Sequence, residues 1–178
     1  MMYLTLASLV ILGEFIGLSV WRFGLQKSYS TYAKLWEGVV PKKVDLNVWR
    51  AVTIIVALLQ VIPMISTLEG SAIQFVGFLT PVYLMAVACT PNYQDDKGEK
   101  IVHYIATALC AVGFLVCLAF GMQPSLWWLP LAWAAGFLFF IGLPSRSFVS
   151  SLALWLECAM FAASYTVQLL PYVQQLLK

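Results

Sequence analysis

Two carboxylic acids stand inside long apolar segments of this sequence, where an ionisable side chain is costly. Glu157 lies within residues 152–170, and Glu14 lies within residues 2–22. Both segments have the length and composition of membrane spans, and an acid at the centre of a span costs about 2.5–3.5 kcal/mol on insertion scales. Such an acid usually faces the interior of a helix bundle, where it can bind a cation, accept a proton or pair with a polar group. Both residues are therefore candidates for a functional site.

Glu157 shares one predicted helix face with other polar residues. Spacings of seven, seven and four residues, which a period of 3.6 places on one side of a helix, separate Ser150, Glu157, Ser164 and Gln168. Tyr165 lies beside them. The pattern predicts a polar stripe that faces the bundle interior and binds a ligand. A structural alternative stays open, because a protonated Glu157 could simply hydrogen-bond a neighbouring helix, an interaction worth about 0.6–2 kcal/mol in membranes.

Glu14 and Glu157 are predicted to lie at similar depth in the membrane. At about 1.5 Å per helical residue, Glu14 is ~12 Å from Arg22 and Glu157 is ~16 Å from Arg146, the basic residues that border their segments. Gln60 falls at a comparable level in the second apolar segment. We therefore expect Glu14, Gln60 and Glu157 to line one pocket that opens toward the cytoplasm. Two carboxylates in one cavity cannot both stay charged cheaply, so at least one would be protonated.

The single histidine, His103, stands near the start of another apolar segment, and Cys110 follows seven residues later. Seven helical residues span ~10 Å, which is too far for both side chains to bind one ion at about 2.0–2.3 Å. We therefore expect no metal site and no cofactor. His103 is instead predicted to contact headgroups or a loop at the inner face of the membrane. Together with a loop that contains Ser28, Ser30 and Tyr32, it would close the inner side of the pocket.

Composition identifies the chain as an integral membrane protein. Of its 178 residues, 62% are hydrophobic and 10% are charged, against about 25% charged residues in soluble domains, and the mean hydropathy is +0.87. Six apolar segments, each near the ~20 residues that cross a bilayer, occupy residues 2–22, 47–67, 70–90, 101–122, 126–144 and 148–171. We predict an all-α fold in which residues 1–178 form a single domain of six transmembrane helices. The net charge of +2 and the scattered basic residues argue against nucleic-acid binding.

The basic residues predict the orientation of this bundle. Nine of the ten lysines and arginines lie in the first, third and fifth connections, and only the C-terminal lysine lies elsewhere. By the positive-inside rule these three connections are cytoplasmic and both termini are outside, as in a multi-pass protein of the bacterial inner membrane. In the first connection, Tyr32, Leu35, Trp36 and Val39 recur at helical spacing, which predicts a short interfacial helix at about residues 30–40. An irregular loop with aromatic anchors is the alternative.

Three short motifs carry a resemblance to a known family. They are Ser28-Tyr29-Ser30-Thr31-Tyr32, the run from Ala86 through Pro91 to Val102-His103-Tyr104, and Trp155-Leu156-Glu157 followed by Ser164-Tyr165. Nearly end to end, the chain resembles a small six-span inner-membrane family of gut bacteria and their phages, for which no activity is established. Its first motif departs from that family's usual Ser-Ile-Ser followed by paired tyrosines.

The layout is more remotely similar to the six-span lipid-remodelling and autophagy-modulator superfamily, whose members also carry a serine motif after the first span. The nearer resemblance implies the six-span topology and supports Ser30, His103 and Glu157 as site residues. The more remote one implies that lipid headgroups or acyl chains are handled.

Three functional classes follow from these observations. The leading prediction is a membrane protein for transport or lipid sensing that binds a small ligand, a lipid headgroup or a cation at Glu14, Gln60, Glu157, Ser164, Tyr165 and Gln168. A lipid-modifying enzyme is the second class, with His103 or Glu157 as the base and a serine as nucleophile. The third is an oligomeric pore or an accessory protein in phage defence or exclusion. The expected partners are the lipid bilayer, the ligand and further copies of the chain.

Overall fold

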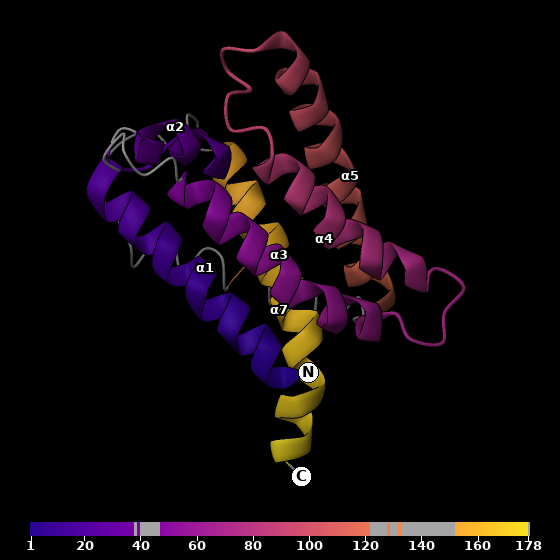
Figure 1. Cartoon of the computed structure of the whole chain (residues 1–178). Helices are drawn as coiled ribbons and strands as arrows, with labels where there is room; N and C mark the ends of the chain where they lie inside the picture. Colours follow the sequence, from indigo (N-terminus) through magenta and orange to yellow (C-terminus); the bar gives the residue numbers. More distant parts are fainter. Residues whose placement is uncertain (38, 40–46, 122–127, 129–131, 133–151, 178) are drawn as a thin grey trace.

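The computed structural model of the chain describes residues 1–37, 39, 47–121, 128, 132 and 152–177. The described residues form helices and connections, with no strand among them. The elements are α1 (Met2–Phe23), the 3-10 helix η1 (Tyr29–Thr31), α2 (Tyr32–Glu37), α3 (Val48–Thr67), α4 (Gln74–Ala88), α5 (Lys97–Gly121) and α7 (Leu152–Leu176). The prediction of an all-α fold is confirmed for this part of the chain (Figure 1).

The boundaries of the long helices follow local sequence signals. α3 begins after Asn47, whose side-chain oxygen accepts the Arg50 backbone N–H at 3.1 Å and caps the helix. α1 ends before Gly24, whose φ of 72° suits glycine best. The predicted segments therefore match α1, α3 and α5 within four residues. α7 extends to Leu176, five residues beyond the predicted end. The segment predicted at 126–144 lies outside the described residues apart from positions 128 and 132.

Three of the described helices are long and apolar enough to cross a membrane. They are α1, α3 and α5, with mean hydropathies of 1.9, 2.0 and 2.3 over their most apolar windows. α4 is apolar but has only 15 residues, about 22 Å of helix against a hydrocarbon core of about 30 Å. Large apolar side chains also cover the outside of the bundle, with Tyr3 and Trp21 each 80% exposed. The chain thus has helices that suit a membrane protein.

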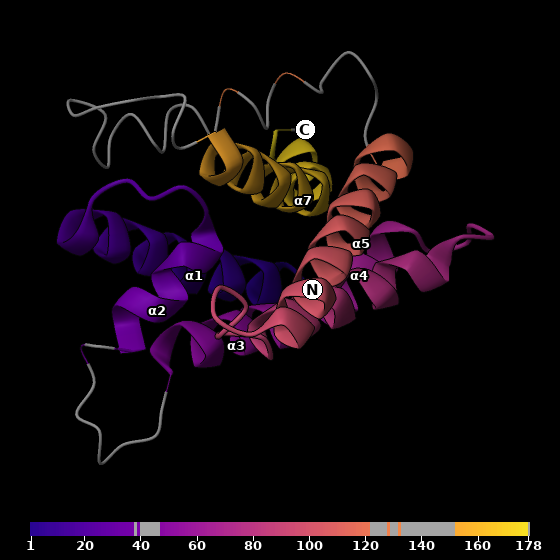
Figure 2. The same cartoon turned by 90° about the horizontal axis from the view of Figure 1, so that it is seen from above.

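The helices pack in the order in which they occur in the sequence, with α7 laid against them. α1 lies beside α3, α3 beside α4 and α4 beside α5, while α7 contacts α5, α1 and α3 (Figures 1 and 2). α3 and α4 form a helical hairpin, and Gly70, with a φ of 78°, lies in the short turn between them. Gly77 allows the two helices to touch, because a Cβ atom there would collide with the Met64 carbonyl group.

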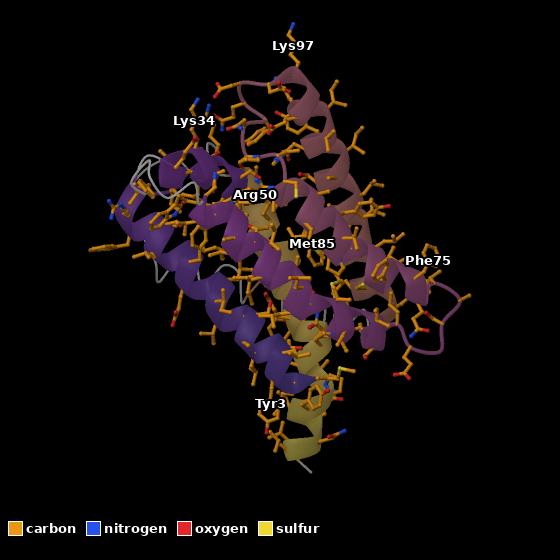
Figure 3. All side chains as sticks on the ribbon, in the orientation of Figure 1. Tyr3, Lys34, Arg50, Phe75, Met85 and Lys97 are labelled. Atoms are coloured by element: carbon orange, nitrogen blue, oxygen red, sulfur yellow. The ribbon has the colours of Figure 1, made fainter. Side chains whose placement is uncertain are left out.

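The connections between the helices and the chain termini lie at two opposite ends of the bundle. The first and third connections meet at one end, where Lys34 Nζ lies 2.8 Å from Asp95 Oδ2. The start of α7 is at this end too, since the Leu154 backbone N–H donates to the Lys27 carbonyl oxygen at 3.1 Å. Both termini lie at the other end (Figure 1). Figure 3 shows Lys34 and Lys97 toward the first end and Tyr3 near the second.

The short helix predicted in the first connection is present, but it packs onto the bundle. α2 covers Tyr32–Glu37, so the alternative of an irregular loop is wrong for these residues. The Trp36 ring lies 5.6 Å from the Phe15 ring and 5.4 Å from the Phe23 ring, measured between centroids. Its Nε1–H donates to Ser19 Oγ at 2.8 Å. The aromatic face of α2 therefore covers the end of α1.

Candidate functional site

Four uncharged polar side chains form a hydrogen-bonded cluster inside the bundle. The Gln168 amide nitrogen of α7 donates to Gln60 Oε1 of α3 at 2.6 Å and to Ser164 Oγ at 2.9 Å. Ser164 Oγ donates to the same Gln60 oxygen at 3.4 Å, and Thr5 Oγ1 of α1 donates to Gln168 Oε1 at 3.0 Å. All four side chains are buried. Three of them, Gln60, Ser164 and Gln168, are residues that the sequence predicts for the site.

The cluster leaves one buried donor without an acceptor among the described residues. The Gln60 amide nitrogen makes no hydrogen bond there, although the residue is only 4% exposed. It borders a narrow gap whose wall includes Ser164, Tyr165 and Phe114. An unsatisfied buried donor costs about 1–3 kcal/mol, and lipid offers it no water. This nitrogen is therefore the group in the cluster that gains most from an added acceptor.

Tyr165 forms a second buried link between α7 and α1. Its hydroxyl group lies 2.8 Å from Ser8 Oγ, which also approaches the Val56 carbonyl oxygen at 3.4 Å. Thr5 and Ser8 were not among the predicted site residues. Their signal was available, because Thr5, Ser8 and Ser19 fall on one helical face of the segment with apolar residues between them. That face is buried, and the opposite face is the exposed one.

Glu14 and Glu157 do not share a pocket in the described part of the chain. Glu14 is exposed on α1, as are Tyr3 and Trp21. Glu157 is half-buried, and its Oε2 accepts the Tyr29 backbone N–H at 2.6 Å. The depth of Gln60 was also predicted wrongly. It is level with Gln168, which lies eleven residues, or about 16 Å, along α7 from Glu157.

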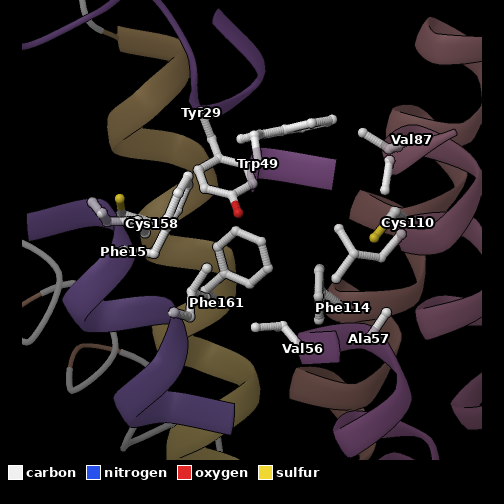
Figure 4. Packing of buried hydrophobic residues seen from close by; sticks show 14 of the residues in the cluster. Phe15, Tyr29, Trp49, Val56, Ala57, Val87, Cys110, Phe114, Cys158 and Phe161 are labelled. Atoms are coloured by element: carbon white, nitrogen blue, oxygen red, sulfur yellow. The ribbon is translucent and has the colours of Figure 1, made fainter. Parts of the chain in front are cut away.

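Glu157 therefore belongs to a different arrangement, in which a loop enters the bundle. The Tyr29 ring lies among three aromatic rings, with centroid distances of 6.1 Å to Phe15, 5.6 Å to Trp49 and 6.0 Å to Phe161 (Figure 4). Its hydroxyl group lies 2.9 Å from Thr53 Oγ1. Burial raises the pKa of the Tyr29 phenol, which therefore stays neutral. Tyr29 thus fills the interior of the bundle at the end where the first and third connections meet. We call this loop, residues 28–32, the Tyr29 plug.

The other predicted residues of the inner loop stabilise this plug. Ser28 Oγ lies 3.1 Å from Thr31 Oγ1, and the Tyr32 hydroxyl group donates to the Gly24 carbonyl oxygen at 2.9 Å. Burial raises the pKa of Tyr32 to about 12. Ser30 is buried in η1. These contacts give the loop residues a structural part in holding Tyr29 inside.

His103 contacts the third connection, which is one of the two environments that the sequence predicts for it. Its Nδ1 lies 2.9 Å from Thr90 Oγ1, and its ring stacks on Tyr93 with 3.9 Å between centroids. No described contact joins His103 to Ser28, Ser30 or Tyr32. The predicted closure of the pocket by the first connection and His103 together is therefore not formed in the described part of the structure.

A cavity of about 190 Å³ lies at the end of the bundle where the termini meet. Its wall includes Thr5 and Gln168 of the polar cluster, so the cluster reaches from the interior to this cavity. The side chains of α1, α3 and α7 that form the rest of the wall are uncharged.

The described residues define an all-helical fold with three helices that suit a membrane protein and with a buried cluster of uncharged polar side chains. No family model, curated protein or solved structure matches the chain. Its function has to be inferred from its own side chains.

Proposed function

We propose that the chain is a six-span protein of the bacterial inner membrane that binds a small ligand between its helices. The ends of α5 and α7 support the span count. Gly121 packs against Thr67 and Val167 at the end with the termini, whereas Leu154 lies at the opposite end beside Lys27. The apolar segment predicted at residues 126–144 stands between these two positions in the sequence and has the length of one further span.

The distribution of basic residues supports the orientation. The first and third connections share one end of the bundle and carry most of the lysines and arginines. By the positive-inside rule this end faces the cytoplasm, and the termini face the outside. The Tyr29 plug then closes the cytoplasmic side, and the cavity beside Gln168 lies on the outer side.

One observation carries the proposal of a ligand site. The buried Gln60 amide nitrogen, next to Ser164 and Gln168, has no acceptor among the described residues. Keeping two amides and a hydroxyl group in the apolar interior is costly unless every polar atom is paired. A small molecule or a lipid headgroup with a hydrogen-bond acceptor would complete the cluster. An uncharged ligand fits better than a cation. Glu157 lies about 16 Å from Gln168 along α7, and its carboxylate already accepts the Tyr29 N–H.

The geometry gives less support to a lipid-modifying enzyme. A serine nucleophile needs a base within hydrogen-bond reach. The described partners of Ser164 are the amides of Gln60 and Gln168, and His103 bonds to Thr90. Neither arrangement pairs a serine with a base.

Native mass spectrometry of the full chain, released from detergent micelles, tests the ligand site. We expect the wild type to retain an added mass of a small molecule or lipid, and we expect Gln60→Leu and Gln168→Leu to lose it. Gln175→Leu makes the same chemical change at an exposed position of α7 and should retain it. No added mass in the wild type, or one that all three variants hold equally, would show that the cluster is only structural.

A further inference from the structure

Four helices contribute to the wall of the cavity at the outer end of the bundle. Thr5 comes from α1, Ser66 and Thr67 come from α3, Gly121 comes from α5, and Gln168 and Tyr172 come from α7. Its volume of about 190 Å³ has room for about six water molecules at ~30 Å³ each. A molecule the size of glycerol fits the same space. The cavity is therefore large enough for a small ligand with several polar groups.

Thr5, Thr67 and Gln168 use their hydroxyl and amide hydrogens within the protein. Thr5 Oγ1 donates to Gln168 Oε1 at 3.0 Å, and Thr67 Oγ1 donates to the Pro63 carbonyl oxygen at 3.0 Å. Both hydrogens of the Gln168 amide are taken by Gln60 and Ser164. The oxygen atoms of these three wall residues still have lone pairs that can accept hydrogen bonds from a ligand.

A proline adds a further acceptor to this wall. Pro171 stands inside α7 and has no N–H to donate to the carbonyl group four residues earlier. That carbonyl belongs to Val167, which also lines the cavity. These wall residues thus present acceptors to which a ligand can supply hydrogens, and the Ser66 and Tyr172 hydroxyl groups can donate to the ligand as well as accept from it.

The described part of the wall also disfavours a cation. The side chains of the described residues that line the cavity include no carboxylate and no basic group. A cation placed there would have no opposite charge nearby, and burying an unpaired charge near a membrane is costly. A molecule with several hydroxyl groups meets both requirements.

We propose that this cavity binds an uncharged polyol, either as a free molecule such as glycerol or as the glycerol headgroup of a neutral lipid such as a diacylglycerol. The proposal rests on the proposed function, because Gln168 belongs both to the interior cluster and to the cavity wall. It adds the chemical class of the ligand and the side from which the ligand enters.

A scintillation proximity assay on the full chain in phosphatidylcholine nanodiscs tests the proposal. Its two arms use radiolabelled glycerol in solution and radiolabelled diacylglycerol in the nanodisc. We expect saturable binding of at least one probe, and excess ethanolamine, which is cationic, should not compete. The arm that saturates identifies the source of the polyol. Absence of saturable binding in both arms, or strong competition by ethanolamine, would overturn the proposal.

Two threonines of similar local structure provide matched variants. Thr67 and Thr166 both donate to the carbonyl group four residues earlier, but only Thr67 lines the cavity. Thr67→Val should weaken probe binding about tenfold, as expected for one lost hydrogen bond, while Thr166→Val should leave it unchanged. Equal binding by the two variants would place the bound probe elsewhere.

The two proposals can fail separately. A retained mass that depends on Gln60, combined with no polyol binding, would leave the interior ligand site in place and remove the polyol assignment. Loss of both results would remove both proposals.

Discussion

The carboxylate of Glu157 accepts the backbone N–H of Tyr29 at 2.6 Å, across 128 residues of sequence. This contact explains why an acid stands in the apolar helix α7. Tyr29 is the first residue of η1, so its N–H has no acceptor within that helix and needs another partner, which lipid does not provide. Glu157 supplies that partner, and the Tyr29 side chain can then fill the space among Phe15, Trp49 and Phe161.

Replacing Glu157 tests whether it stabilises the fold through its hydrogen-bond acceptor or through its charge. Glu157→Leu removes the acceptor and leaves the Tyr29 N–H unpaired, which costs about 1–3 kcal/mol and should lower Tm by about 5 °C for a chain of this size. Glu157→Gln keeps an oxygen that can accept and should change Tm by less than half as much. Thermal unfolding in detergent, followed by circular dichroism, measures both. Equal losses for the two variants would contradict an acceptor role.

Truncating the Tyr29 side chain should open the end of the bundle where the first and third connections meet. Tyr29→Ala removes a buried aromatic ring and leaves a cavity, whereas Tyr29→Phe loses only the contact with Thr53. The buried thiol of Cys158 lies near this ring (Figure 4). In a Cys89→Ser background, we expect maleimide labelling of Cys158 to be at least tenfold faster in Tyr29→Ala than in Tyr29→Phe. Equal rates would mean that Tyr29 does not control access.

Single cysteines at the two ends of the bundle test its orientation. Asn92 lies in the third connection and Glu69 in the α3–α4 turn, and both are exposed. On intact spheroplasts, an impermeant maleimide should label Glu69→Cys and not Asn92→Cys, with Cys89 replaced by Ser in both. Lysis should make Asn92→Cys reactive. The opposite pattern would reverse the orientation.

The α3–α4 hairpin should be sensitive to a single methyl group. Gly77→Ala places a Cβ atom against the Met64 carbonyl group, which belongs to a helix backbone and cannot move aside alone. We expect a loss of about 1–3 kcal/mol in the free energy of unfolding. Gly98→Ala is the control, because the only neighbour within 4 Å of its Cβ is a side-chain oxygen of Asp96. Similar stability of the two variants would argue against close packing at Gly77.

The sequence was sufficient for the helices but not for the faces they bury. Apolar runs and the Asn47 cap locate α1, α3 and α5, because length and hydropathy are local properties. The buried face of α1 depends instead on its neighbours. The cost of an intramembrane acid suggested that Glu14 points inward, yet the buried polar residues of α1 include Thr5 and Ser8, whose small hydroxyl groups allow close packing.

The two environments of α7 illustrate the same limit for the site. Helical spacing correctly grouped Ser164 with Gln168, and Gln60 of α3, which was also predicted for the site, joins them in the structure. The same spacing assigned Glu157 to this group, but its partner is a backbone N–H of a loop. Every residue except proline has such a group, so the sequence carries no signal that distinguishes Tyr29 as the partner.

Ligand binding beside Gln60 and Gln168 is tested most directly by an experimental density map of the full chain in a lipid nanodisc, at a resolution that shows side chains. We predict density that does not belong to the protein, in contact with the Gln168 amide and extending from the cluster into the outer cavity. An interior in which protein side chains alone pair the Gln60 amide and fill that cavity would contradict the proposal.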